Sequence, residues 1–353
     1  MTPSFILFYV EGVNELQDAA CHLILIPVID GVKQEIREYF FNPEAPFLLV
    51  KSGITEKEVL TFPKFSEQWA EVQSILDKFD IAVCAAEGYS AHTLCSTLKR
   101  LNVPLAPMEY CNAKAICRRS LNEVSYSLDY LSYVKFNDTI PETDPPAIAN
   151  RWCDLALMGL ADRPEVSLRD FLKQAKISLG VLSTTELKPS LCLKDYSKRK
   201  GHKFDPSAVA VDANPENPLF GMNVVFTGKL ETLTRNEARS LVVKVGGNAP
   251  ENLNKDTDYL VVGVQDLRVV GEKGLSSKMK SASKYKEKGC PIEVIDERDF
   301  LDMIGNDYIP TPAPVKKRVL PFITEEDISH LSDQQVQKAL DTLNQFRENN
   351  GLN

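Results

Sequence analysis

The sequence predicts two α/β domains in one chain, a mixed sheet with flanking helices followed by a smaller domain with a parallel sheet. The first observation is a set of three apolar runs within residues 1–41, separated by turn residues, which is typical of an antiparallel meander. The second is the alternation of helical and strand patterns that follows, up to residue 160. The third is a new alternation of strands and helices over residues 218–304. A length of 353 residues agrees with two domains.

The first predicted domain, residues 1–160, begins with strands and continues with helices. A helix is predicted over residues 65–79, where Trp69, Val72 and Leu76 recur at helical spacing. The remaining patterns predict strands at residues 5–10, 21–28, 38–41 and 80–85, and helices at residues 91–101, 112–119, 127–134 and 147–160.

Composition divides the rest of the chain into three parts. Residues 161–217 are predicted to be a partly ordered linker, because their second half is rich in Pro, Asp, Asn and Lys, although residues 167–175 fit a helix. Residues 305–353 are predicted to be a Pro-rich segment followed by an amphipathic helix from Ser332. In the second domain, residues 218–304, the patterns predict strands at residues 223–226, 259–262 and 292–295, and helices at residues 234–245, 277–288 and 296–304.

The net charge of −8 comes from the first domain. Residues 1–160 carry 13 Lys and Arg against 21 Asp and Glu, whereas residues 218–304 carry 13 of each. The first domain is therefore not expected to bind DNA through bulk charge, and any contact there requires a local groove or bound cations.

Cysteine usage and hydropathy indicate the compartment. Eight cysteines without a Cys-x-x-Cys pair, together with only four histidines, predict reduced buried thiols rather than a zinc site. No apolar run is long enough to span a membrane, so no membrane contact is expected. The sequence therefore predicts a cytoplasmic protein.

A series of motifs runs through the second domain in a fixed order. They are Phe226-Thr227-Gly228-Lys229-Leu230, Thr234-Arg235-x-Glu237-Ala238, Gly246-Gly247, Asp256-x-Asp258-Tyr259-Leu260-Val261-Val262-Gly263 and Ser276-Ser277-Lys278. In this order they resemble a BRCT domain, closest to those of bacterial DNA ligases and of the large clamp-loader subunit. Phe300 stands where that family has a Trp in its last helix.

The BRCT resemblance implies a phosphate-binding pocket at Thr227, Gly228 and Lys278. A hydroxyl, an uncrowded backbone N–H and an ammonium at a helix N-terminus can converge on a dianion. The ligand would be a phosphoserine or phosphothreonine of a partner protein, or a 5′-phosphate at a DNA end. The alternative is that Thr227 and Gly228 only turn the chain. Four more lysines are expected to form a positive rim: Lys273, Lys280, Lys284 and Lys286.

Residues 4–160 resemble the DnaQ-like exonuclease family of the epsilon proofreading subunit of bacterial DNA polymerase III, which is part of the DEDD superfamily. The motifs are Asn42-Pro43-Glu44, Ser52-Gly53-Ile54-Thr55-x-x-x-Val59, Pro63-x-Phe65-x-x-x-Trp69, Tyr110-Cys111-Asn112 and Tyr126-Ser127-Leu128. The resemblance implies an RNase H-like fold. In active members it implies a 3′–5′ exonuclease in which four acidic residues hold two Mg²⁺ or Mn²⁺ ions.

Most of those acidic residues are replaced in this chain. The first motif, Asp-x-Glu, falls on residues 9–11, so Glu11 is the one surviving acid and the only catalytic candidate. The Asp of the second motif falls on Ser90, and the His and Asp of the third fall on Asp144 and Ala149. Because these cations need anionic oxygen ligands, the sequence predicts a degenerate site that holds no metal.

Two questions about this site stay open at this stage. Glu87, Asp144 or Asp154 would restore a metal site only if the backbone register also moved. The aromatic residues Phe8, Tyr9 and Tyr89 could stack on the bases of single-stranded DNA, or they could fill the vacated site as core, which we favour for Tyr9.

Three functions follow from these resemblances. The leading prediction is a DNA replication or repair protein with an inactive exonuclease-like domain and a BRCT domain that binds DNA ends, single strands or phosphorylated partners. One alternative is an active exonuclease that depends on Mg²⁺ or Mn²⁺. The other is a protein-binding adaptor without DNA contact, which the acidic first domain permits.

Overall fold

The computed structural model describes residues 3–14, 17–47, 52–85, 90–123, 125–141, 143–163, 165–192, 214–230, 232–263 and 276–305. All of these belong to one compact unit, Met1–Ile309. The amphipathic helix predicted from Ser332 lies outside the described residues.

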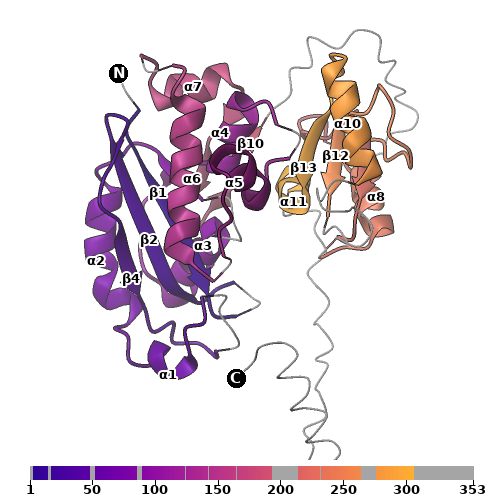
Figure 1. The fold of residues 1–353 in the computed structure, drawn as a ribbon. Helices are drawn as coiled ribbons and strands as arrows, with labels where there is room; N and C mark the ends of the chain where they lie inside the picture. The colour runs from indigo at the N-terminus through magenta and orange to yellow at the C-terminus, as the bar shows by residue number, and fades with distance from the viewer. Residues whose placement is uncertain are drawn as a thin grey trace, which may run out of the picture. The chain divides into compact units, whose positions relative to one another are not determined.

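The N-terminal domain is built on a mixed sheet (Figure 1). Its central strand, β1 (Phe5–Gly12), pairs antiparallel with β2 (Ala20–Ile29) and parallel with β5 (Ala82–Cys84). Strand β6 (Met108–Asn112) continues the sheet parallel to β5. This order, with β2 antiparallel, is the RNase H-like arrangement that the sequence resemblance implied. The edges are formed by β3 (Val32–Lys33) and β4 (Arg37–Phe40) beside β2, and by β8 (Gly180–Leu182) and β9 (Leu187–Lys188) beyond β6.

Helices cover both faces of this sheet (Figure 1). Successive side chains of a strand point to opposite faces, so Phe5, Leu7 and Tyr9 enter one core while Ile6 and Phe8 enter the other. Burial on both faces explains why β1 and β2 are continuous apolar runs rather than alternating ones. The first core is covered by α4 (Ala113–Ser120), α5 (Leu128–Phe136), α6 (Pro145–Leu160) and α7 (Leu168–Gln174), and the second by α2 (Phe65–Leu76) and α3 (Ser90–Leu101).

Polar caps fix where these helices begin. Asn112, Ser127, Asp144 and Ser167 are the N-caps of α4, α5, α6 and α7, and each accepts a hydrogen bond from a backbone N–H of its first turn. The short helix α1 (Glu56–Val59) begins at a capping box formed by Thr55. The predicted helices are therefore confirmed to within a few residues.

Several strands were missed. Strand β6 precedes the helix that was predicted from residue 112. The segment predicted to have little structure contains β8 and β9, and also β7 (Ile177–Ser178) and β10 (Leu191–Cys192), which pair with each other. These strands are two to five residues long, too short to display a period.

The C-terminal domain has a parallel sheet of β11 (Val224–Thr227), β12 (Tyr259–Val262) and β13 (Glu293–Asp296), in that order. Three helices pack against this sheet: α8 (Arg235–Lys244), α10 (Ser277–Glu287) and α11 (Glu297–Ile304). The capping box of Thr234 and Glu237 at the start of α8 is confirmed. Phe300 is fully buried, with its ring centroid 5.2 Å from that of Phe226 in an edge-to-face contact.

Other general expectations are also tested. All eight cysteines are free thiols and seven of them are buried, as predicted, whereas Cys290 is partly exposed. Burial raises the pKa of Cys117 and of Cys153 to about 12, so these thiols stay protonated and act as core residues. Among the described residues, no helix has the length and apolar character needed to cross a membrane.

Candidate functional site

Buried core side chains occupy the positions of the first and third nuclease motifs. Tyr9 on β1 is 6% exposed and Ala149 on α6 is fully buried, and both belong to the core between the sheet and α6. Tyr9 therefore packs in the interior, as favoured from the sequence. The suggestion that Phe8 stacks on bases is wrong, because Phe8 is fully buried on the opposite face. Tyr89 lies outside the described residues.

The surviving acid, Glu11, binds protein groups. It lies near the end of β1 and is 7% exposed. Its Oε1 accepts a hydrogen bond of 3.0 Å from the backbone N–H of Ser52, and its Oε2 accepts one of 2.6 Å from the Ser52 hydroxyl. Both carboxylate oxygens thus hold the segment that leads to α1.

Ser90, at the position of the second motif, also has a structural contact. Its hydroxyl accepts a hydrogen bond of 2.9 Å from the backbone N–H of Val10 and donates one of 3.2 Å to the Val10 carbonyl. Strand β5 pairs with β1 only as far as Phe8 and Cys84, so Val10 lies beyond that pairing. The Ser90 side chain therefore satisfies backbone groups that a longer β5 would have paired.

The carboxylates that could have replaced the lost ligands have other partners. Asp144 caps α6 by accepting from the Ala147 N–H at 3.0 Å, and Asp154 pairs with Lys33 at 2.6 Å. Glu87 lies outside the described residues. Within the described ranges no group of three or more His, Cys, Asp or Glu side chains is arranged to hold a metal ion. The described residues at these motif positions do not fit a two-metal centre.

The predicted phosphate site of the C-terminal domain is brought together by the fold. Thr227 ends β11, and its Oγ1 is 3.3 Å from the Oγ of Ser276, the N-cap of α10. Gly228 follows with a φ of +78°, a left-handed conformation that glycine adopts without strain. Lys278 lies in the first turn of α10. Two hydroxyls, a glycine N–H and an ammonium thus lie around one end of the parallel sheet.

Lys278 is held in place by main-chain groups. Its Nζ donates hydrogen bonds to the carbonyl oxygens of Phe226 at 3.0 Å and of Glu251 at 2.7 Å. Burial lowers the pKa of Lys278, and the guanidinium of Arg235 acts in the same direction. An anion at this position would relieve both effects, because it favours the charged ammonium.

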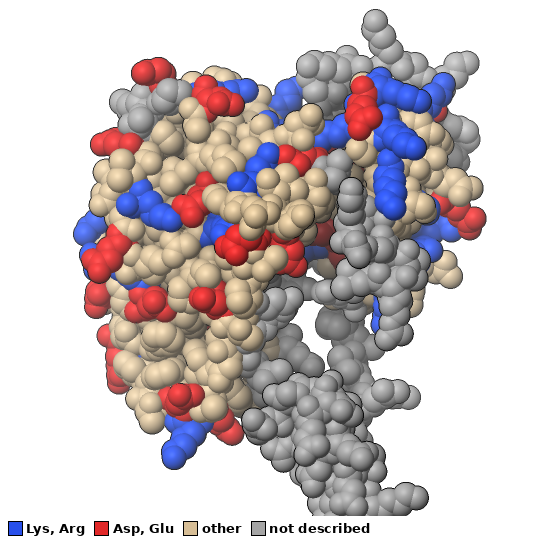
Figure 2. All heavy atoms as spheres, in the orientation of Figure 1, with Lys and Arg blue, Asp and Glu red and all other residues tan. Residues whose placement is uncertain are grey.

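Arg235 is a site residue that the sequence analysis did not assign. It is the first residue of α8, and its Nη2 donates a hydrogen bond of 3.0 Å to the Gly228 carbonyl. The Thr-Arg pair of the second motif was the available signal. Lys and Arg side chains gather over α10 in Figure 2. Lys280 and Lys284 are exposed there, whereas Lys286 instead donates to the Glu123 carbonyl, and Lys273 lies outside the described residues.

Comparison with known families agrees with this domain. Residues 214–304 match the family model described as BRCA1 C Terminus (BRCT) domain. This segment is a BRCT domain. DNA ligases of Brucella ovis and Brucella canis are each 25% identical to this chain over 295 residues, which is 79% of this chain and 34% of the ligase. The chain spans about a third of the length of these relatives.

Solved structures with a similar fold include exonucleases. Exonuclease X in complex with 5′ overhanging duplex DNA is 16% identical, covers 46% of this chain and 94% of its own, and has a TM-score of 0.34. A full-length 3′-exonuclease is 11% identical, covers 54% and 67%, and has a TM-score of 0.42. The exonuclease-like fold in front of the BRCT domain rests on its own sheet order.

Proposed function

We propose that this chain is a non-catalytic protein of DNA replication or repair whose BRCT domain binds the terminal phosphate of a DNA end. The observation that carries the proposal is the cluster of Thr227, Gly228, Ser276 and Lys278, with Arg235 as a second cation beside it. Two cations and two hydroxyls suit a dianionic monophosphate, which accepts several charge-assisted hydrogen bonds at once.

Two features favour a DNA end over a phosphorylated protein. Lys280 and Lys284 are exposed on the same helix as Lys278, where the further phosphates of a strand can pair with them. The curated relatives are named DNA ligases, and a ligase acts at a DNA end. A phosphorylated peptide remains the competing ligand for the same pocket.

The proposal of a non-catalytic protein rests on the contacts of the nuclease-motif residues. Tyr9 and Ala149 are core residues, and Glu11 is bound through both oxygens to Ser52. An active exonuclease would require several carboxylates to converge on metal ions, and Asp144 and Asp154 instead cap a helix and pair with a lysine.

The test compares duplex DNA that carries a 5′-phosphate with the same duplex that ends in a hydroxyl, using fluorescence anisotropy. The full chain is expected to bind the phosphorylated end more tightly. Lys278→Ala should reduce that preference by about tenfold or more, because a charge-assisted hydrogen bond contributes about 1.5–3 kcal/mol. Thr227→Val, which preserves side-chain shape, should reduce it as well.

The matched control is Lys284→Ala on the same helix. This exposed residue should weaken binding to both ends equally, because it can contact only the strand. An unchanged end preference in Lys278→Ala would contradict the proposal. Displacement of the DNA by a phosphoserine peptide but not by its unphosphorylated form would favour the phosphoprotein alternative.

A further inference from the structure

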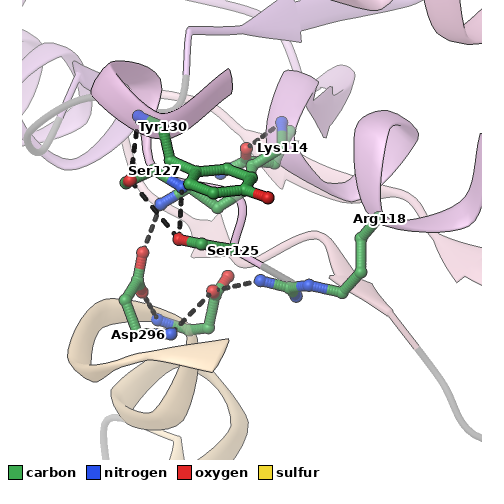
Figure 3. Close-up of polar contacts among 8 residues, drawn as sticks. Lys114, Arg118, Ser125, Ser127, Tyr130 and Asp296 are labelled. Atoms are coloured by element: carbon green, nitrogen blue, oxygen red, sulfur yellow. Dashed lines mark hydrogen bonds and ion pairs between the residues drawn. The ribbon is translucent and has the colours of Figure 1, made fainter. Parts of the chain in front are cut away.

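Helix α4 of the exonuclease-like domain forms a row of ion pairs with the BRCT domain. Arg119 pairs with Glu293 at 2.7 Å, Arg118 pairs with Asp299, and Lys114 pairs with Asp296. Figure 3 shows Arg118 extending toward the turn that carries Asp296. All three acids come from β13 or from the first turn of α11. Three cations of one helix are thus matched one by one with three carboxylates.

The basic side chains of these pairs are largely removed from water, whereas the side chain of Asp296 is 37% exposed. The side chains of Lys114, Arg118 and Arg119 are 9%, 6% and 18% exposed. Burial disfavours the charged form of Asp296, yet the Lys114 ammonium holds the pKa of this carboxyl well below its usual range. Buried ion pairs contribute little net stability, because the cost of desolvation offsets the attraction, although each group strongly requires an opposite charge.

The contact between α4 and the BRCT domain is loosely packed around these ion pairs. A cavity of about 220 Å³ lies beside Arg118 and Arg119, and is also lined by Tyr126 and Lys286. A second cavity, of about 50 Å³, lies beside Lys114 and Asp296. Permanent interfaces are packed like protein interiors, whereas contacts between domains that separate are more polar and less complete. The ionic row and these cavities are typical of the second kind.

The basic row is unusual for its surroundings. Residues 1–160 have an excess of acidic over basic residues, 21 against 13. Helix α4 nevertheless carries three basic residues and no acidic one in eight positions. Lys114 and Arg118 are four residues apart and therefore lie on one face, with Arg119 next to them. Such a row pairs with a regular series of anions, and arginine in particular suits the oxygens of phosphates.

We infer that Lys114, Arg118 and Arg119 form a binding site for the phosphate backbone of single-stranded nucleic acid, and that Glu293, Asp296 and Asp299 occupy this site in place of phosphates. The inference rests on the proposed function only in taking nucleic acid as the ligand. In the closed arrangement the BRCT carboxylates neutralise the row. A nucleic-acid strand and these carboxylates compete for it, so binding of the strand favours separation of the two domains.

The test measures binding of a 5′-hydroxyl single-stranded oligonucleotide to the full chain, so that the terminal-phosphate pocket is not probed. The double variant Asp296→Asn, Asp299→Asn should bind at least tenfold more tightly than the unchanged chain, because it removes two of the competing carboxylates. The slope of the logarithm of the binding constant against the logarithm of the salt concentration should steepen by about 1.4, since two cations are freed and each phosphate of a single strand contributes about 0.7. Adding Arg118→Gln and Arg119→Gln should cancel the gain.

Asp302→Asn is the matched control. Asp302 lies on the same helix, α11, but pairs with Arg298 within that helix at 2.9 Å. Its replacement should leave affinity for the strand within about twofold of the unchanged chain, whereas a gain equal to that of the double variant would overturn the inference.

Small-angle scattering of the charge-reversed variant Asp296→Lys, Asp299→Lys measures whether the domains separate. An expanded variant whose affinity for the strand is unchanged would overturn the binding site. A variant that stays compact would contradict the inference that these ion pairs hold the two domains together. Lys278→Ala should leave the gain of the double variant intact, so that failure of the terminal-phosphate pocket and failure of the α4 site are distinguishable.

Discussion

Residues at the nuclease-motif positions are used by the fold, each in a different way. Tyr9 is core, Ser90 completes the hydrogen bonding of β1, and Glu11 anchors the segment before α1. At the residue scale these three positions are therefore filled by side chains that contact the protein itself. Tyr9 and Ser90 carry no charge, so they avoid the repulsion of like charges that gathered carboxylates produce.

Asp302 provides a prediction on pH dependence. Burial raises the pKa of this carboxyl to about 6, although Arg298 opposes the effect. The folded protein therefore holds the proton more tightly than the unfolded chain does. The tighter proton binding of Asp302 contributes fully to the free energy of unfolding at pH 4 and below, and this contribution is lost as the pH rises to about 6.

Asp302→Asn should remove that loss. Its free energy of unfolding at pH 7.5 should exceed that of the unchanged chain by about 1–3 kcal/mol, and the difference should shrink toward zero at pH 4. Urea unfolding at the two pH values measures it. A variant that is less stable at pH 7.5 would mean that the bridge to Arg298 outweighs the cost of burying the carboxylate.

At the scale of the elements, a side chain completes the hydrogen bonding of β1 where its backbone pairing with β5 ends. Strand β5 is only three residues long, and Val10 of β1 extends past it. The hydroxyl of Ser90 at the start of α3 meets both polar groups of Val10, so one side chain joins a helix to the central strand.

Ser90→Ala should therefore destabilise the exonuclease-like domain. A buried N–H and carbonyl would lose their partner, which costs about 1–3 kcal/mol. Thermal or urea unfolding measures the loss. The control is Ser74→Ala on α2, an exposed serine whose removal should cost less than about 0.5 kcal/mol. Equal effects of the two variants would contradict the role given to Ser90.

Prediction of elements from the sequence succeeded where a pattern was long. The runs of β1 and β2, eight and ten residues, and the capping box of α8 carry their own signals, whereas the four-residue helix α1 was not predicted. Strand β6 was missed because its five residues, of which two are buried, show no clear period. Strand β8 forms beside β6 from earlier in the chain, and a single stretch of sequence does not contain that information. Strands β7, β9 and β10 pair with near neighbours, but each has only two residues and shows no period.

The candidate sites also differ in how far the sequence predicts them. Thr227, Gly228 and Lys278 were named because the BRCT resemblance implies a phosphate pocket there, and the fold places the end of β11 beside the start of α10. The role of Arg235 depends on its bond to the Gly228 carbonyl. The row of α4 pairs with residues more than 170 positions away, so nothing near Arg118 in the sequence predicts it.

At the scale of the whole molecule, charge is distributed by domain. The exonuclease-like domain has an excess of acid, and lysines gather over α10 of the BRCT domain (Figure 2). Under the proposed function, association with a nucleic acid should therefore begin at the lysines of α10, and it should weaken with salt. Under the inference drawn above, contact with α4 would follow only after the carboxylates of β13 and α11 move away.

The contacts of the nuclease-motif residues predict that this chain does not cleave DNA. Incubation with 3′-labelled single-stranded and duplex DNA and Mn²⁺ should release no nucleotides above the level of a Glu11→Ala control. The reason is that Glu11 is the one retained family acid among four and is bound to Ser52. Cleavage that requires Mn²⁺ and disappears in Glu11→Ala would mean that carboxylates converge around Glu11 when metal binds. Cleavage of equal rate in both chains would come from a contaminating nuclease and would leave a binding protein.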